Sequence, residues 1–514
     1  MLAKCHSAAV SGVDAVDVEI EVCAKAGPPR FSIVGLPDAA VRESEDRVAT
    51  AIQNSAFKFK EADVTVNLAP ANLRKEGPVY DLPIAAAVLA ATGQGGAGAP
   101  ERLSNFALAG ELALSGAVRG TRGILPIAMA AKKAGLEGII VPAQNAAEAA
   151  VVSGIDVYAV ENLREAIDFL WGRTVLKPRR ENLDELLSRE LDSGEDFADV
   201  KGQETAKRAI EVAVAGGHNI LLIGSPGAGK TMLARRIPSI LPPMSPEEAL
   251  EVTRIHSVAG ILKGQTSLVA HRPFRAPHHT VSDAGLLGGG THPVPGEVSL
   301  AHCGVLFLDE LPEFHRNVLE VMRQPLEDGH VVISRAAANC DFPSKFMLVA
   351  AMNPCPCGYN GDPKHECRCS QSQVMNYRNK LSGPLLDRID IQLEVPPVPV
   401  SDLEGLERGE PSAAIRERVV AARAVQTARF AGKPSVRCNA DMSGKDITEF
   451  CTMTEDAKNI LRLGMEDYGL SARAYSRVLK VSRTIADLAG SEAILPEHVT
   501  EAVRYRSLDQ SYWV

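Results

Sequence analysis

The sequence predicts an α/β protein in three parts, for three reasons. Residues 1–171 alternate short β-branched runs with alanine-rich helical stretches, which is typical of an α/β domain. Residues 197–395 contain fully apolar runs that predict buried strands of a parallel sheet. After Pro396-Pro397-Val398-Pro399 the pattern is helical, so we expect 396–514 to form a helical domain. The polar residues 172–196 are expected to be a linker with a short helix.

Individual elements follow from the same patterns. In the amino-terminal domain we expect strands at 16–22, 64–68, 138–141 and 156–160. In the central domain we expect strands at 220–223, 305–308 and 346–352. In the last domain we expect helices at 413–430, 454–468, 471–488 and 496–505.

Composition limits the class of protein. The chain has 514 residues, of which 45% are hydrophobic and 23% charged, as in ordinary soluble globular proteins. Acidic residues interrupt the first 22 residues, and the longest apolar stretch, 82–92, is too short to span a membrane. We therefore expect a cytoplasmic protein with no membrane partner. A net charge of -9 excludes a wholly basic nucleic-acid coat, so any DNA contact must be local.

A glycine-rich loop follows the first central strand and is a Walker A motif. Its residues are Gly224-Ser225-Pro226-Gly227-Ala228-Gly229-Lys230-Thr231. The glycines allow backbone N–H groups to surround nucleotide phosphates, and Lys230 can reach the β and γ oxygens. The Thr231 hydroxyl can bind Mg²⁺. The alternative is an incidental glycine turn, which the preceding strand and the following helical pattern disfavour.

Two adjacent acids end the run 305–308 and form a Walker B motif. Asp309 is expected to hold Mg²⁺, and Glu310 to polarise the attacking water, so the pair predicts ATP hydrolysis. The alternative is a solvated strand end without a catalytic role.

Further motifs resemble one family. The segments are 274–280, 295–302, 353–358, 382–390 and 471–475, and together they resemble the AAA+ ATPases of the magnesium-chelatase-like branch, most closely the ComM/YifB-type proteins of bacteria. The resemblance implies that Asn353 is sensor 1, that Arg388 is an arginine finger for a neighbouring subunit, and that Arg473 is sensor 2 of the helical lid. Arg477 is an alternative to Arg473.

The resemblance also implies two insertions that face the pore of a ring. Gly288-Gly289-Gly290 fits a flexible loop in a helix-2 insertion. Residues 328–339 fit a hairpin before sensor 1. In that hairpin, Arg335 matches a pore-lining basic residue of minichromosome-maintenance helicases and is expected to contact DNA. A solvent-facing arginine is the alternative.

Two groups of residues suggest metal. Four of the ten cysteines, Cys355, Cys357, Cys367 and Cys369, have a spacing that could give a closed, structural zinc site, with free thiols as the alternative. His278-His279 is a weaker candidate, because neighbours in an extended segment point in opposite directions. We expect a structural or phosphate-contact role for this pair.

The amino-terminal domain has a resemblance of its own. Segments 110–118, 134–136 and 141–145 resemble the proteolytic domain of Lon proteases. Where Lon has its nucleophilic serine this chain has Val79, and Leu125 lies near the position of the catalytic lysine. A serine–lysine dyad needs both groups, so we expect a Lon-like fold without peptidase activity.

These features predict an AAA+ ATPase with ATP, Mg²⁺ and structural Zn²⁺ as cofactors. The resemblance implies a homo-oligomeric ring, a hexamer, that acts on single-stranded or branched DNA as a branch-migration helicase in natural transformation. The alternatives are a magnesium-chelatase motor subunit and a Lon-like protein-remodelling ATPase.

Overall fold

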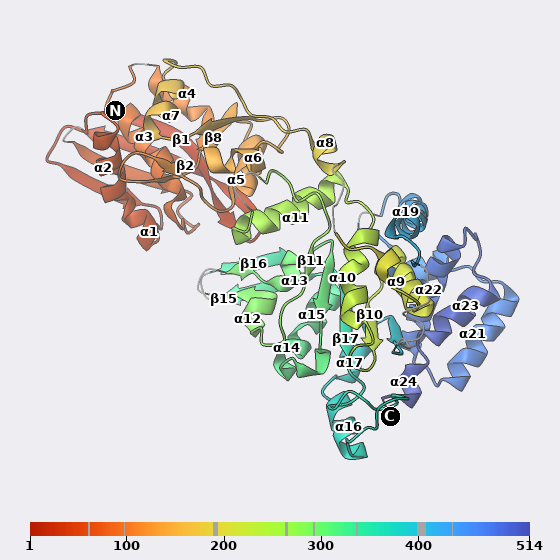
Figure 1. The fold of residues 1–514 in the computed structure, drawn as a ribbon. Coiled ribbons are helices and arrows are strands. Elements are labelled where there is room, and N and C mark those ends of the chain that lie inside the picture. Colours follow the sequence, from red (N-terminus) through yellow and green to blue (C-terminus); the bar gives the residue numbers. More distant parts are fainter. Residues whose placement is uncertain are drawn as a thin grey trace.

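The computed structural model describes residues 1–59, 62–96, 98–188, 194–262, 266–290, 293–335, 338–397, 408–433 and 435–513. A seven-stranded sheet, a five-stranded sheet and a group of helices follow one another along the chain (Figure 1). The predicted α/β class, the parallel sheet and the helical carboxy-terminal region are confirmed. Within the described residues, no helix is both long and apolar enough to cross a membrane.

The amino-terminal sheet has the strand order β3-β4-β2-β1-β5-β8-β9. Its strands are β1 (Leu2–Ser11), β2 (Asp14–Lys25), β3 (Arg30–Val34), β4 (Asp63–Ala69), β5 (Phe106–Leu108), β8 (Gly138–Pro142) and β9 (Asp156–Val160). Only the β1–β2 and β2–β4 pairs are antiparallel. β1, β3 and β5 were not predicted, because none of them is a run of β-branched residues long enough to stand out in the sequence.

Helices cover this sheet. α3 (Asp81–Ala91) is buried at every position and packs with α5 (Ile124–Lys133) against β1 and β2. The other elements are α1 (Ala39–Arg42), α2 (Ser44–Asn54), α4 (Ala99–Ser104), β6 (Glu111–Leu112), β7 (Val118–Arg119), α6 (Ala146–Ala149), α7 (Leu163–Leu170) and, in the predicted linker, α8 (Leu183–Leu187).

The central sheet is parallel throughout, in the order β11-β14-β17-β10-β18. Its strands are β10 (Ile220–Ile223), β11 (Phe274–Arg275), β14 (Val305–Leu308), β17 (Met347–Met352) and β18 (Ile391–Glu394). Strands β10, β14 and β17 are buried along their whole length, as parallel strands covered on both faces are. The flanking helices are α9 (Glu204–Gly216), α10 (Lys230–Ile240), α14 (Arg316–Val321), α15 (Arg323–Asp328), α16 (Gln371–Arg378) and α17 (Gly383–Leu386).

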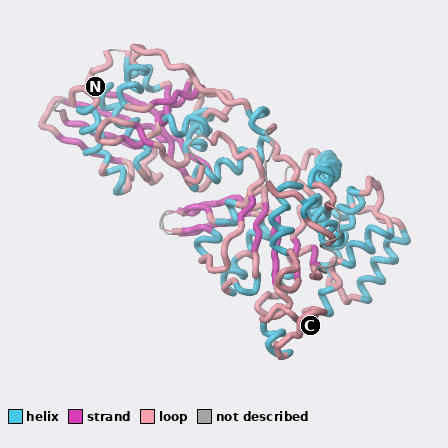
Figure 2. The backbone as a smooth tube through the Cα atoms, in the orientation of Figure 1, coloured by secondary structure: helices cyan, strands magenta, loops and turns pink. Residues whose placement is uncertain are grey.

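The helices after residue 408 share a core with the central sheet. They are α19 (Ser412–Arg429), α20 (Gly444–Phe450), α21 (Glu455–Asp467), α22 (Ala472–Leu488), α23 (Pro496–Arg504) and α24 (Leu508–Ser511). Figure 2 shows no strand in this right-hand part of the described chain. α22 and α19 pack directly on α9, and one apolar cluster includes residues from β10, α9 and α22. Part of the predicted boundary, at 398–399, lies outside the described residues.

The segment between α10 and β14 joins the two sheets. α11 (Pro246–Ala259) packs on α5, and its Arg254 forms a 2.6 Å ion pair with Asp14. Then follow α12 (Asp283–Leu287), β12 (Gly288–Gly289), β13 (Val294–Pro295) and α13 (Glu297–Leu300). The glycines expected in a flexible loop therefore begin a short antiparallel pair. A Cβ at Gly288 would lie 2.3 Å from the Val294 carbonyl oxygen, so the close approach of the backbones requires glycine there.

A second antiparallel pair lies before β17. β15 (His330–Arg335) pairs with β16 (Ala338–Pro343) over the segment predicted as a hairpin. Gly12, in the turn between β1 and β2, lies against this pair, because a Cβ there would be 2.9 Å from the Asp341 carbonyl oxygen. Residues 336–337 and the side chain of Arg335 lie outside what the structure describes.

Candidate functional site

Parallel register places the predicted motif residues at one edge of the central sheet. Ile223 pairs with Met352, so Gly224 and Asn353 both begin just beyond the sheet. Leu308 pairs with Ala350, so Asp309 and Glu310 leave the sheet at the same edge. The chain therefore brings together three motif segments that are distant in sequence.

The loop between β10 and α10 has the backbone of a phosphate-binding loop. Gly227 and Gly229 have φ values of +81° and +89°, which favour glycine. A Cβ at Gly224 would lie 2.4 Å from the Val395 carbonyl oxygen, so this position also requires glycine. α10 starts at Lys230 and points its amino-terminal N–H groups toward the loop. Gln203, which the sequence did not single out, supports the loop by donating from Nε2 to the Ala228 carbonyl at 2.5 Å.

The side chain of Lys230 folds back from the start of α10 into this loop. Its Nζ donates to the carbonyl oxygens of Gly224 (2.7 Å) and Ser225 (3.0 Å) and to Oδ1 of Asn353 (3.2 Å). Burial lowers the pKa of the lysine. Its hydrogen-bond partners in the described residues are neutral oxygens, so an anionic phosphate oxygen would be a stronger partner than any of them.

The two acids and Thr231 form the other wall of the site. The Thr231 hydroxyl donates to Oδ2 of Asp309 at 2.7 Å, and the backbone N–H of Glu310 donates to Oδ1 of Asp309 at 3.0 Å. A hydroxyl beside a carboxylate is an oxygen donor set of the kind that Mg²⁺ binds together with phosphate oxygens. These groups line a cavity of about 340 Å³ with Pro226, Lys230 and Asn353.

Glu310 has an unusual backbone and an unexpected neighbour. Its φ is +53°, in the left-handed region that costs a side-chain-bearing residue energy, and its carboxylate is 54% exposed. Nδ1 of His279 lies 3.5 Å from Oε2 of Glu310. His279 is therefore positioned to orient the carboxylate that faces the cavity.

The expectation that His278 and His279 point in opposite directions was wrong. Their ring centroids are 4.0 Å apart, because the segment turns here instead of continuing as a strand, and the Val281 N–H donates to the His278 carbonyl at 2.9 Å. His278 contacts the Thr280 hydroxyl at 3.0 Å. The contact of His279 with Glu310 indicates a role for this histidine beside the Walker B acids. Strand periodicity alone did not predict that role.

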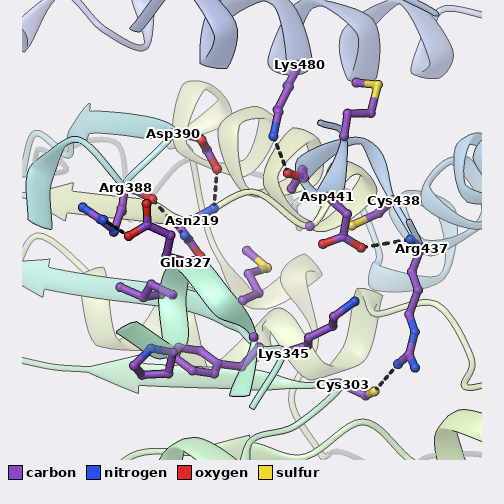
Figure 3. A pocket seen from close by; sticks show the side chains of 18 of the residues that line it. Asn219, Cys303, Glu327, Lys345, Arg388, Asp390, Arg437, Cys438, Asp441 and Lys480 are labelled. Atoms are coloured by element: carbon purple, nitrogen blue, oxygen red, sulfur yellow. Dashed lines mark hydrogen bonds and ion pairs between the residues drawn. The ribbon is translucent and has the colours of Figure 1, made fainter. Parts of the chain in front are cut away.

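The predicted arginines lie in a different cavity, of about 660 Å³. Arg388 is 11% exposed and forms an ion pair with Glu327 (Figure 3). It also donates to the Pro384 carbonyl at 2.6 Å. Arg473 lines the same cavity, is 71% exposed and lies 3.3 Å from Asp387. Within the described chain, neither arginine lines the cavity that contains Lys230.

Arg477, the alternative to Arg473, has a buried partner. It forms an ion pair with Asp390 and donates to the Arg388 carbonyl at 3.3 Å. Burial would raise the pKa of Asp390, but Arg477 and His218 outweigh burial and hold that pKa well below its ordinary value. Arg477 is therefore committed to the buried Asp390, whereas Arg473 is mostly exposed and pairs with the partly exposed Asp387.

The four cysteines predicted to bind metal come together. Their Sγ atoms all lie within 4.8 Å of one another, and three of the separations are 3.4, 3.7 and 3.6 Å. These values are close to the edges of a tetrahedron with metal–sulfur bonds of about 2.3 Å, roughly 3.8 Å, and far from a disulfide bond of about 2.0 Å. Backbone N–H groups lower the pKa of Cys357 to about 6, whereas burial raises the pKa of Cys355 to about 12, so without metal the first thiolate of the cluster forms at Cys357. The cluster can therefore hold a metal ion.

A second group with metal-binding side chains has another explanation. Glu251, His302 and Cys303 also lie within 4.8 Å of one another. Arg437 donates to Sγ of Cys303 at 2.9 Å (Figure 3). It also donates to Glu251 at 2.8 Å. The guanidinium already supplies the positive charge, so the group is an ion-pair network that links α11 to the segment before α20.

The residues that replace a Lon dyad are apolar and buried. Val79 lies in a short 3-10 helix, Pro78–Tyr80, and is 9% exposed, and Leu125 is fully buried in α5. Both side chains belong to the amino-terminal core. Neither can serve as a nucleophile or a base.

Comparison with known proteins gives matches along most of the chain. Three protein-family models match: "Magnesium chelatase, subunit ChlI" at 196–403, "Subunit ChlI of Mg-chelatase" at 20–145, and "Magnesium chelatase, subunit ChlI C-terminal" at 409–506. Competence protein ComM of Haemophilus influenzae is 46% identical over 99% of this chain and 98% of its own length. The protein YifB of Escherichia coli is 44% identical over 98% of this chain and 97% of its own. Lon protease 2 of Bacillus subtilis is 30% identical over 31% of this chain and 30% of its own.

Proposed function

The chain belongs to the ComM/YifB-type magnesium-chelatase-like proteins, and from that premise we propose that it is a ring-forming AAA+ ATPase that couples ATP hydrolysis to movement along DNA. The observation that best supports the ATPase is the convergence of Lys230, Thr231, Asp309 and Glu310 at one sheet edge. The proposal includes the division into a Lon-like domain (1–171), a linker (172–196), an AAA+ core (197–395) and a helical lid (396–514), acting in the cytoplasm.

Each residue at this edge has a role that its position supports. Lys230 and the loop N–H groups bind the phosphates, while Thr231 and Asp309 supply oxygens to Mg²⁺, which stabilises charge on the phosphates when bound. Glu310 accepts a proton from the attacking water. Asn353, whose amide already contacts Lys230 at 3.2 Å, orients that water.

The position of the arginines supports a ring. Arg388 and Arg473 lie together in the second cavity, so the described residues of one chain form the phosphate site without these two arginines. A neighbouring copy that presents these two arginines to the phosphate cavity would complete the site. Repetition of that head-to-tail contact closes into a ring, for which we propose six subunits.

The DNA substrate rests on relatives and on one hairpin. The relative from Haemophilus influenzae is named a competence protein and matches this chain over nearly its full length. We propose that this chain likewise acts in natural transformation, as a helicase that promotes branch migration of single-stranded or branched DNA. The β15–β16 pair, with Arg335 at the end of β15, is the proposed contact with DNA in the pore.

The metal at the cysteine cluster is proposed to be zinc. Four thiolates in a closed tetrahedral arrangement are typical of structural Zn²⁺.

Glu310→Gln should keep ATP binding and abolish turnover, because Thr231 and Asp309 still bind Mg²⁺ while proton acceptance is lost. Lys230→Ala should instead weaken binding itself. Binding of a fluorescent ATP analogue and phosphate release, measured on the same preparations, separate the two effects. Turnover by Glu310→Gln at the rate of the unmodified protein would remove this residue from the mechanism.

Arg388→Ala should bind ATP but hydrolyse it slower by about 10³- to 10⁵-fold, as expected for loss of an arginine finger. Mixed with Lys230→Ala subunits, it should regain part of the activity, since the intact arginine of one subunit meets the intact phosphate loop of the other. Phosphate release by mixtures of exchanging subunits tests this expectation. A mixture no more active than either variant alone would show that Arg388 does not act across subunits.

Arg335→Ala should weaken binding of single-stranded DNA and flatten its salt dependence by about 0.7 in the log–log slope for each phosphate that the arginine no longer neutralises. Branch migration of a four-way junction should fall, while basal ATPase should persist, because no residue of the phosphate site changes. Arg462→Ala, at an exposed position of α21, is the control. A protein that hydrolyses ATP but neither binds DNA nor moves the junction would favour a chelatase motor subunit or a protein-remodelling ATPase.

Metal analysis of freshly purified, tag-free protein should find one zinc per chain. Removal of that zinc should lower thermal stability, because metal binding at a structural site contributes folding free energy. Cys357→Ser should lose the metal, whereas Cys23→Ser, outside the cluster, should retain it. Protein without zinc that is equally stable would reject the site.

A further inference from the structure

The cysteine cluster is directly continuous with the phosphate site. Asn353, which contacts Lys230, is followed by Pro354 and then by the fully buried Cys355. The Pro354 carbonyl accepts from Nε of Arg378 and from the Tyr512 hydroxyl, both at 3.3 Å. Hydrogen bonds to Pro354 therefore fix the backbone directly after Asn353. The cysteine cluster begins at the following residue, Cys355.

The cysteine loop also contacts the phosphate loop across space. Gly358 has a φ of +87°, and a Cβ built on it would lie 2.6 Å from Cδ of Pro226. Pro226 is part of the phosphate loop and lines the nucleotide cavity. The loop backbone at Gly358 therefore packs directly on the element that binds phosphate.

Local contacts hold this loop together with the thiols: the Asp362 carboxylate accepts from the backbone N–H groups of Lys364 and His365 at 2.8 and 3.0 Å, and the Tyr359 ring lies against His365. Residues 353–370 contain turns but no helix or strand, and of the four cysteines only Cys355 is buried. The loop ends at Ser370, which is the N-cap of α16. Arg378, on the last turn of α16, donates to the Pro354 carbonyl at the start of the loop. The local contacts of Asp362 and Tyr359 lie within residues 359–365, whereas the thiols join Cys355 and Cys357 to Cys367 and Cys369 across the loop, so a bound metal would fix its closure and offset the cost of ordering it.

We propose that metal bound by the four cysteines holds Gly358 against Pro226 and so positions the phosphate loop and Asn353 for nucleotide. Metal occupancy thereby sets nucleotide affinity. This inference rests on the proposed nucleotide site. Because coupling between two sites is reciprocal, nucleotide should also tighten metal binding by the same factor.

Two glycines of the same loop make a matched test. Gly361 has a φ of +82°, nearly that of Gly358, but no atom lies within 4 Å of a Cβ placed there. Gly358→Ala and Gly361→Ala therefore impose similar backbone strain, and only the first pushes the loop away from Pro226. A difference in nucleotide affinity between the two variants therefore reports the loss of the Gly358–Pro226 contact and not backbone strain.

The experiment uses the full chain in reducing buffer, loaded with Co²⁺, whose absorption reports tetrahedral thiolate coordination. A fluorescent ATP analogue should bind Gly358→Ala about tenfold more weakly than the unmodified protein, equivalent to about 1.4 kcal/mol, and Gly361→Ala within about twofold. Both variants should keep the cobalt spectrum and share one unfolding temperature. Equal affinities of the two variants would overturn the role of the contact.

Removal of the metal tests the proposed coupling independently of the glycine variants. Stripping metal from the unmodified chain with a chelator should weaken analogue binding about tenfold, and zinc should restore it. Unchanged affinity after stripping would overturn the inference and leave the proposed function standing. Failure of the metal-loaded, unmodified chain to bind the analogue at all would instead contradict the proposed function. A metal affinity that rises when the analogue is present would support the coupling, and one that does not would contradict it.

Discussion

The in-register alignment of β10, β14 and β17 is the constraint on which the site depends. Because all three strands run parallel and are buried, their carboxyl ends fall at one edge, and each following residue is a motif residue. The Lys230–Asn353 and Thr231–Asp309 hydrogen bonds are consequences of that alignment. A shift of one strand by one residue would turn its side chains to the other face and separate these groups.

The sequence alone was enough to locate the buried strands of the central sheet and the motifs that follow them. Buried apolar runs located β10, β14 and β17, and the glycine pattern located the phosphate loop. The sequence was not enough to predict irregular turns or contacts between residues that are far apart in the chain. The turn after β11 that places His279 beside Glu310 has no periodic signal, and the contact of Gly358 with Pro226 joins residues more than a hundred positions apart.

Under the proposed function, the described residues of one chain provide only part of the catalytic site. The phosphate cavity contains a lysine, two acids and an amide, whereas Arg388 and Arg473 line another cavity together with Glu327 and Asp387. If Arg388 acts on a neighbour's nucleotide as proposed, that contact must replace the ion pair of Arg388 with Glu327 within the chain. The proposal therefore couples assembly to hydrolysis through an exchange of the partner of Arg388.

The dependence of hydrolysis on protein concentration tests this account most directly. Phosphate release per chain and particle mass should be measured on the same dilution series, with ATP saturating throughout. The account predicts that turnover per chain falls together with the fraction of assembled protein, while nucleotide binding by the dilute chain persists. Full turnover per chain at concentrations where only single chains are present would contradict it.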